Sequence, residues 1–254
     1  LYSHPLTLAY SVLLLWPLFL FGTFRQPSKP LLWFGLIVCA VLLYLSMSRT
    51  ALAVALLILG LGIFTGLTGR LRALLIAIAL VGLGGLAITD NPVKDKFVGT
   101  FSGEGFDRHG SYPDDRLAFW HAHYEIWKDA PLAGHGFHWN DQKRAPYYEQ
   151  IGLGNFPKHY TAHNQYLQTA VNSGLVGLFL LLYWFAWHWQ VGRRHEDDYK
   201  DTTAKIRRYT LLAFALGCVT QNAFFDAEVR YVLTVLTTFL WAYEFEERRL
   251  ESFV

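Results

Sequence analysis

Four residues of types that bind anions or move protons are candidates for a functional site in this sequence: Arg49, Arg116, His163 and Asp226. A guanidinium can hold an oxyanion through two parallel hydrogen bonds, which an ammonium group cannot do. An imidazole exchanges protons near neutral pH, and a carboxylate beside it can orient it. These residue types predict a site that binds an anion and accepts a proton, provided that the fold brings them together.

The histidine lies just before an apolar block, in the stretch TAHNQYLQTAVNSGLVG. Thr161 is a good helix N-cap, so we expect His163 and Asn164 in the first turn of a helix. Free N–H groups and the helix dipole attract anions there, which makes Asn164 a candidate substrate-binding residue. The helix either ends at the Asn-Ser-Gly of this stretch or continues into the block. The histidine is either functional or structural, and Asp226 either orients it or pairs with Arg230.

Both arginines stand at positions that need an explanation. Arg49 lies between two apolar runs whose other ends are basic, so the chain is expected to turn back there. It is either an anion ligand or an arginine that reaches from the membrane interface to water. Arg116 falls in the first turn of a helix expected from Asp114 or Asp115 to Pro131, where the dipole favours acidic residues. It is either functional or paired with one of those aspartates.

Seven of the ten histidines lie within 109–163, and two pairs of them raise the question of a metal. His121 and His123 are spaced i, i+2, which directs their rings to different faces of a helix. His135 and His138 are accompanied by no cysteine set and no zinc-protease motif. We predict that no metal and no cofactor takes part, and that packing at the membrane interface is the alternative role of these rings.

The composition is that of a membrane protein. Hydrophobic residues make up 53% of the 254 positions and the mean hydropathy is +0.22, whereas ordinary soluble domains contain roughly 45–50%. Both cysteines lie in apolar runs, so no disulfide framework is implied. Seven apolar runs predict membrane-spanning helices, at about 6–24, 31–47, 51–68, 71–89, 175–189, 209–225 and 231–243.

Alternate connections between these runs are basic, which places them in the cytoplasm. The segment 90–160 then lies outside, and its eight Lys/Arg and ten Asp/Glu leave it two charges negative. The predicted fold is all-α and polytopic, with four spans in 1–89, a partly helical periplasmic loop in 90–162, and three spans with a cytoplasmic C-terminus in 163–254. Because the chain starts with leucine rather than methionine, we expect further spans before it.

At these residues the sequence resembles the O-antigen ligase family and the wider superfamily of O-antigen polymerases and ligases. The stretch HNQYLQTAVNSGLVG is similar to the family pattern of a histidine, an asparagine-like residue and two later glycines, here His163, Asn164, Gly174 and Gly177. SRTALAV and RLAFWHAHYEIWKDAPLAGHGF also look like family segments, and the likeness covers residues 40–245. Trp120 departs from the ligase pattern, which can have leucine there.

The resemblance implies a fold like that of the type C glycosyltransferases, in the bacterial inner membrane, with a periplasmic loop over a lateral cavity. It implies transfer of O-antigen polysaccharide from undecaprenyl pyrophosphate to lipid A–core in lipopolysaccharide biosynthesis. The partners are then the lipid-linked donor, the lipid A–core acceptor and the bilayer, and not nucleic acid. Arg49 and Arg116 would hold the pyrophosphate, His163 would be the base, Asp226 a further catalytic residue, and Asn164 would contact substrate. Attack with a single base would invert the anomeric centre.

Two other kinds of function stay open at this level. Polymerases and protein O-oligosaccharyltransferases of the same superfamily share the motif, and the departure at Trp120 keeps them as alternatives. A transporter of lipid-linked glycans would also use outward arginines at an amphipathic cavity. It gives His163 no role, however, and it favours charged residues within spans, which 51–69 and 73–89 do not contain.

Overall fold

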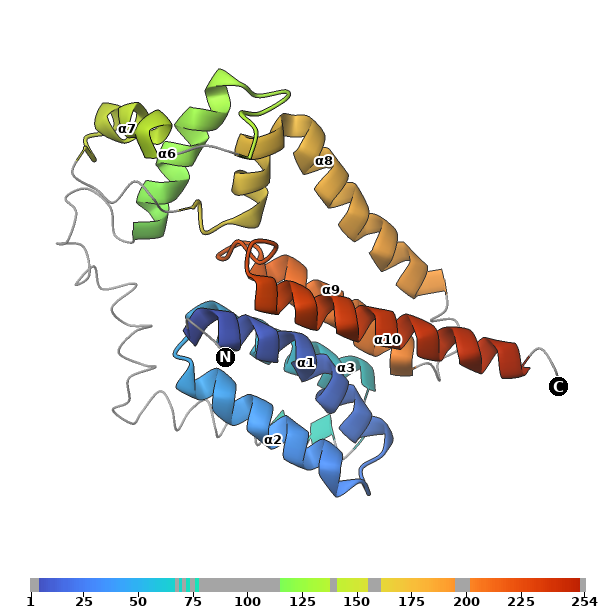
Figure 1. Ribbon diagram of the computed structural model, residues 1–254. Coiled ribbons are helices and arrows are strands. Elements are labelled where there is room, and N and C mark those ends of the chain that lie inside the picture. Colours follow the sequence, from blue (N-terminus) through green and yellow to red (C-terminus); the bar gives the residue numbers. More distant parts are fainter. Residues whose placement is uncertain are drawn as a thin grey trace. The chain divides into compact units, whose positions relative to one another are not determined.

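The computed structural model describes residues 5–66, 69, 72–73, 76–77, 115–137, 141–154, 161–194 and 202–251. These ranges contain helices and turns and no strand, which confirms the all-α class (Figure 1). The chain forms two compact units: unit 1 comprises 1–95, 188–217 and 225–254, and unit 2 comprises 96–187 and 218–224. Almost all of the predicted span 71–89 and the first part of the predicted loop, 90–114, lie outside the described residues.

Unit 1 is a helical bundle built around its first helix. It contains α1 (Pro5–Arg25), α2 (Pro30–Leu45), α3 (Arg49–Gly66), α9 (Thr202–Gly217) and α10 (Ala227–Glu251). Helix α1 packs against the other four (Figure 1). The indole N–H of Trp16 donates to the carbonyl of Ala55 at 3.1 Å, and the hydroxyl of Thr210 donates to the carbonyl of Leu14 at 3.3 Å. This central position explains why α1 is apolar around its whole circumference.

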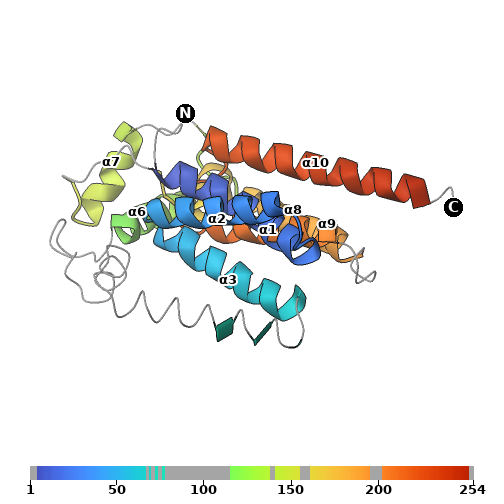
Figure 2. The ribbon, with the colours of Figure 1, turned by 90° about the horizontal axis from the view of Figure 1, so that it is seen from below.

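The chain reverses between α2 and α3, as the sequence predicts, and the two helices lie side by side (Figure 2). Met47 in the connecting turn has a left-handed φ of 53°. Ser48 caps α3, because its hydroxyl accepts the N–H of Ala51 at 3.4 Å and its carbonyl accepts the N–H of Leu52 at 3.0 Å. Arg49 is therefore the first residue of α3.

Two helices in the described ranges are long and apolar enough to cross a membrane, Pro5–Arg25 and Gln165–Gln190, and the segments Pro30–Leu45 and Arg49–Thr65 are apolar but shorter. The second of the long segments belongs to α8 (Gln165–Arg194). Its residues after Gly174 expose large apolar side chains: Leu175, Val176, Phe179, Leu180, Leu182, Tyr183 and Trp187. Such a surface is unfavourable in water and favourable against lipid. These helices support a membrane protein, while the number and orientation of the spans stay predictions.

The predicted position of the sixth span, 209–225, is wrong. Helix α9 begins at Thr202 and ends at Gly217, and the residues that follow form turns. The helix includes a basic stretch because its arginines pack on aromatic rings. The guanidinium carbons of Arg207 and Arg208 lie 4.6 Å and 4.3 Å from the ring centroids of Trp241 and Trp189. Cation–π packing allows these charged side chains to lie against apolar surface.

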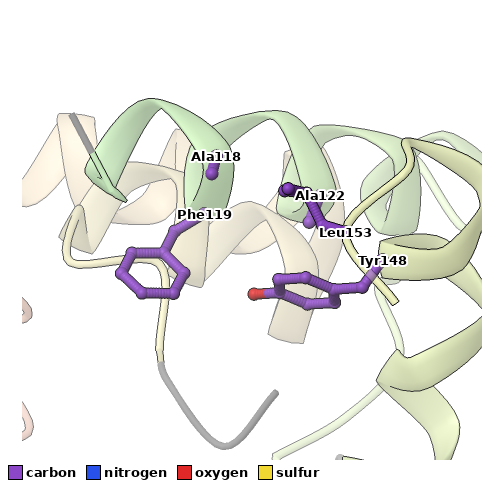
Figure 3. Close-up of a cluster of buried hydrophobic side chains, with 5 residues drawn as sticks. All are labelled: Ala118, Phe119, Ala122, Tyr148 and Leu153. Carbon is purple, nitrogen blue, oxygen red and sulfur yellow. The ribbon is translucent and has the colours of Figure 1, made fainter. Parts of the chain in front are cut away.

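Unit 2 contains α6 (Asp115–Asp129), α7 (Asp141–Gln150) and the beginning of α8. The predicted bounds of the loop helix are confirmed, since α6 begins at Asp115 and ends before Pro131. Helices α6 and α7 and the turn after α7 share a small buried cluster, formed by Ala118, Phe119, Ala122, Tyr148 and Leu153 (Figure 3). Short side chains on α6 let the large tyrosine of α7 fit beneath it.

Candidate functional site

His163 lies before α8 rather than in its first turn. Its φ of 46° is left-handed, which costs a non-glycine residue on the order of 1–3 kcal/mol. Asn164 is the N-cap of α8, because its Oδ1 accepts the N–H of Leu167 at 3.0 Å and its carbonyl accepts the N–H of Gln168 at 2.9 Å. The prediction that Thr161 caps this helix is therefore wrong. Asn164 has a structural role, and its contact with substrate stays a prediction.

Amide side chains hold the backbone on both sides of His163. The N–H of Ala162 donates to Oε1 of Gln168 at 3.0 Å, and the N–H of Asn164 donates to Oδ1 of Asn222 at 2.9 Å. These acceptors are themselves buried, with 3% of the surface of each residue exposed. Hydrogen bonds on either side of a left-handed residue hold its backbone in place, and they fix the position from which the His163 side chain starts.

The segment 218–224 clamps the start of α8. The N–H of Gln165 donates to the carbonyl of Cys218 at 2.8 Å, and Oε1 of Gln165 accepts the N–H of Phe224 at 3.0 Å. With Leu167 bonded to the cap, these first-turn N–H groups already have protein partners. The expectation that free N–H groups at this helix start bind an anion is wrong for these positions.

Helix α6, which carries the candidate residue Arg116, contacts the segment that carries His163. The ring of Phe119 packs against the ring of His163, with centroids 5.5 Å apart. Arg116 lies three residues before Phe119 in the first turn of α6, so the two share a side of the helix. Unit 2 therefore joins the segment that carries Arg116 to the segment that carries His163, although the two residues are 47 positions apart in the sequence.

A buried histidine lies behind this contact. His123 is fully buried, and its Nδ1 lies 2.8 Å from the carbonyl oxygen of Phe119. The pKa of His123 is lowered to about 4, mainly by burial and also by the charges of Arg144 and His163, while the bond to the Phe119 carbonyl opposes the change. The sequence raises His123 only as a possible metal ligand, and it gives no indication of a role for Arg144. The buried apolar residues of α6 lie at positions 118, 119, 122 and 126, and this helical spacing places His123 on the same side.

The two histidines of the HxH pair diverge, as their spacing predicts. His121 is on the exposed side of α6, 3.7 Å from Glu125, whereas His123 is buried. Among the residues for which the structure gives positions, no group of three or more His, Cys, Asp or Glu could hold a metal ion. His138 lies outside that part of the chain. Independence of the reaction from metals stays a prediction.

The loop after α6 docks into a break in α8. Gly174 has non-helical angles, φ 63° and ψ −162°, so α8 is kinked there rather than ended or continuous. Backbone groups on both sides of the break form hydrogen bonds with the loop. Before the break, the carbonyls of Val171 and Asn172 accept the N–H groups of His135 at 2.8 Å and Gly136 at 2.9 Å. After the break, the N–H of Leu175 donates to the carbonyl of Pro131 at 2.8 Å. The loop satisfies groups that the kink would leave unpaired, which fixes α6 relative to the start of α8.

Replacing Gly134 with alanine should destabilise the protein much more than the same change at Gly136. Both glycines have positive φ, 70° and 84°, so each substitution costs about 1–2 kcal/mol in backbone strain. A Cβ at Gly134 would also lie 2.5 Å from backbone atoms of Ser173 and Gly174, whereas a Cβ at Gly136 would meet nothing within 4 Å. We expect a loss of roughly 3 kcal/mol or more for Gly134→Ala. Thermal unfolding in detergent micelles measures both, and equal losses would contradict the docking.

Arg49 and Asp226 belong to unit 1, and both lie at helix N-termini. Asp226 immediately precedes α10, and its carbonyl accepts the N–H of Arg230 at 3.0 Å. A carboxylate is favoured at this end of the helix dipole, whereas a guanidinium is disfavoured. Arg49 and Arg116 both occupy the disfavoured position, each in the first turn of its helix. That Arg49 and Asp226 meet His163 stays a prediction.

A comparison with protein-family models matches residues 34–182 to the family described as O-antigen ligase. The match covers more than half of the chain and includes three of the four predicted site residues, Arg49, Arg116 and His163, but not Asp226. It also contains the docked loop and the kink of α8. A comparison with curated proteins gives no match. On the strength of this match the chain belongs to the O-antigen ligase family.

Proposed function

We propose that the protein transfers O-antigen polysaccharide from undecaprenyl pyrophosphate to lipid A–core, at the periplasmic face of the bacterial inner membrane. One observation supports this proposal most. His163 is held in a left-handed conformation, and its ring packs against Phe119 on the helix whose first turn carries Arg116. A candidate base and a candidate anion ligand thus come from the two family segments that the fold joins.

In the proposed reaction, a sugar hydroxyl of lipid A–core attacks the anomeric carbon of the donor glycan. The hydroxyl proton passes to the ring of His163, the new carbon–oxygen bond forms, and the bond from the anomeric carbon to the pyrophosphate oxygen breaks. Its electron pair leaves with undecaprenyl pyrophosphate. A single displacement inverts the anomeric centre. The leaving group departs as an anion, so positive charge is needed more than a general acid.

Arg49 and Arg116 are proposed to bind the pyrophosphate. A planar guanidinium donates two parallel hydrogen bonds to phosphate oxygens, and its charge counters the charge that develops on the leaving group. Each arginine stands in the first turn of a helix, where the partial positive charge of the dipole adds to its own. Such a position costs stability in the free protein and favours an anion when one binds. Asp226 is proposed to orient His163 or to stabilise its protonated form.

Reconstitution with purified donor and acceptors tests the function directly. Full-length protein in liposomes should release undecaprenyl pyrophosphate and join the glycan to lipid A–core. Transfer to the glycan of a second donor would indicate a polymerase, transfer to a pilin-like protein an O-oligosaccharyltransferase, and movement of intact donor across the bilayer a transporter. Each of these three results would contradict the proposed ligase.

The same assay tests whether a divalent cation takes part. We expect EDTA to leave the rate of transfer unchanged, because two guanidiniums can neutralise a diphosphate without a metal. Added Mg²⁺, Mn²⁺ or Zn²⁺ should have no effect beyond ionic strength. A rate that EDTA abolishes and one of these ions restores would show that the arginines are insufficient.

A further inference from the structure

We propose that His123 is a positioning residue for His163, with its Nε2 lone pair accepting a hydrogen bond from one bound water that in turn accepts the ring N–H of His163. This inference rests on the proposed function, because it assumes that His163 is the base. It adds a residue that the family motif does not contain. Both histidines and Phe119 belong to unit 2.

The protonation state of His123 follows from its geometry. A carbonyl oxygen can only accept, so the 2.8 Å contact between Nδ1 and the carbonyl of Phe119 requires the proton on Nδ1. Since burial keeps the pKa of His123 near 4, the ring is neutral at working pH and Nε2 carries a lone pair. This atom is fully buried and has no hydrogen-bond partner among the residues that the structure describes. A buried acceptor without a partner is costly, and it calls for a donor.

His163 is the best candidate to hold a water in place as that donor. Phe119 contacts both rings, because its carbonyl holds Nδ1 of His123 while its side chain packs against His163 at 5.5 Å. Two charged or titratable groups act on His123: Arg144 from α7, and His163 from the segment before α8. Tyr148 also lies in this core, with its hydroxyl pointing toward the Phe119 ring (Figure 3). Arg144 and the hydroxyl of Tyr148 are rival donors, and neither would make the Nε2 resonance of His123 depend on His163.

A neutral acceptor suits a base that becomes charged. When one ring nitrogen of His163 takes the proton of the attacking hydroxyl, the other N–H donates more strongly to the water that bridges it to Nε2 of His123. The proton stays on His163 and His123 stays neutral, so no second positive charge develops beside the base. The hydrogen bond would fix both the tautomer and the orientation of His163, as a carboxylate does for the histidine of a hydrolase triad.

Two substitutions separate the lone pair from the local structural bond. His123→Asn keeps an N–H that can donate to the carbonyl of Phe119 and removes the acceptor at Nε2. His123→Gln places a carbonyl oxygen near Nε2 and removes the donor at Nδ1. We expect His123→Asn to lower kcat by about 10- to 100-fold with donor KM unchanged, and His123→Gln to retain most of the rate. His121→Asn, on the exposed side of the same helix, is the matched control and should have no effect.

The pH profile distinguishes positioning from a merely structural role. Without the acceptor, the protonated form of His163 is less stable, so the acid limb of the transfer profile should move to lower pH in His123→Asn. A purely structural role predicts the reverse ranking, with His123→Gln inactive and less heat-stable, His123→Asn active, and neither profile shifted. That result would overturn the inference.

Nuclear magnetic resonance of isotope-labelled histidine in nanodiscs supplies a readout besides activity. His123 should carry its proton on Nδ1 at neutral pH, and its Nε2 resonance should change in His163→Asn but not in Arg144→Gln. The opposite response, or a proton on Nε2, would overturn the pairing of the two rings. If His163→Asn transfers glycan normally, the base role fails, whereas this spectrum still decides by itself whether the rings are paired.

Discussion

Replacing His163 with asparagine should lower the rate of glycan transfer by about 10²- to 10⁴-fold, which is roughly 3–5 kcal/mol of activation free energy. A sugar hydroxyl is a poor nucleophile near neutral pH, so the reaction depends on a base placed beside it. Asparagine removes that base and adopts a left-handed φ more readily than most residues. The substitution therefore tests chemistry with little change in backbone strain. His163→Ala should lose as much activity.

Folding and donor binding should survive the loss of His163, because the bonds that hold this segment come from its neighbours Ala162 and Asn164. Thermal unfolding, donor binding and transfer should be measured on the same preparation over a range of pH. In the unsubstituted protein, transfer should fall at acidic pH as imidazole becomes protonated. Transfer by His163→Asn within a few-fold of normal would exclude the base. Lost donor binding with unchanged unfolding would instead assign His163 to the diphosphate.

The helix that carries Arg116 could be predicted closely because local chemistry sets its limits. An aspartate starts α6, and a proline with a left-handed glycine follows its end, so no distant contact is needed to place the boundaries. Its buried side was harder to predict. The large apolar residues Leu117 and Tyr124 recur at helical spacing, yet they are 40% and 48% exposed, and the neighbouring alanines and Phe119 form the core. Alanine gives a weak hydrophobic signal, although it lets α7 approach closely.

The start of α8 could not be predicted from local sequence. Thr161 and Asn164 are both residues that cap helices well, and the choice between them depends on Asn222, 58 positions further along the chain. Bonds from Asn222 and Gln168 fix the segment so that Asn164 is the cap and His163 is left-handed. The backbone N–H groups of Gln165 and Leu167 therefore have protein partners, and the proposed mechanism relies on the two arginines for positive charge.

A left-handed backbone conformation at a non-glycine residue marks a place where the chain is strained. Two non-glycine residues in the described ranges have positive φ, Met47 and His163. One lies two residues before Arg49, and the other is the proposed base itself. Strain of this kind persists where surrounding contacts hold it, which is common at functional sites. The sequence contains no glycine or proline at either position to predict it.

Replacing Arg49 or Arg116 with lysine should reduce transfer almost as strongly as replacing it with alanine, by about 10²-fold or more. Lysine keeps the charge and loses the planar fork that donates two parallel hydrogen bonds to phosphate oxygens. In the first turn of a helix, a cation is already disfavoured by the dipole, so a simple need for charge does not explain these positions. The losses should appear in donor binding as well as in the rate.

Arg25→Lys is the matched control, because Arg25 is an exposed arginine in the last turn of α1, where the dipole favours a cation. It should leave unfolding temperature, donor binding and transfer unchanged. If Arg49→Lys and Arg116→Lys both transfer at near-normal rates while their alanine counterparts do not, charge alone suffices and the proposed fork geometry is wrong. If only one of the two tolerates lysine, that arginine acts as a point charge and the other holds the diphosphate. Combining Arg49→Ala with His163→Asn separates the roles further, since loss of donor binding should follow the arginine and not the histidine.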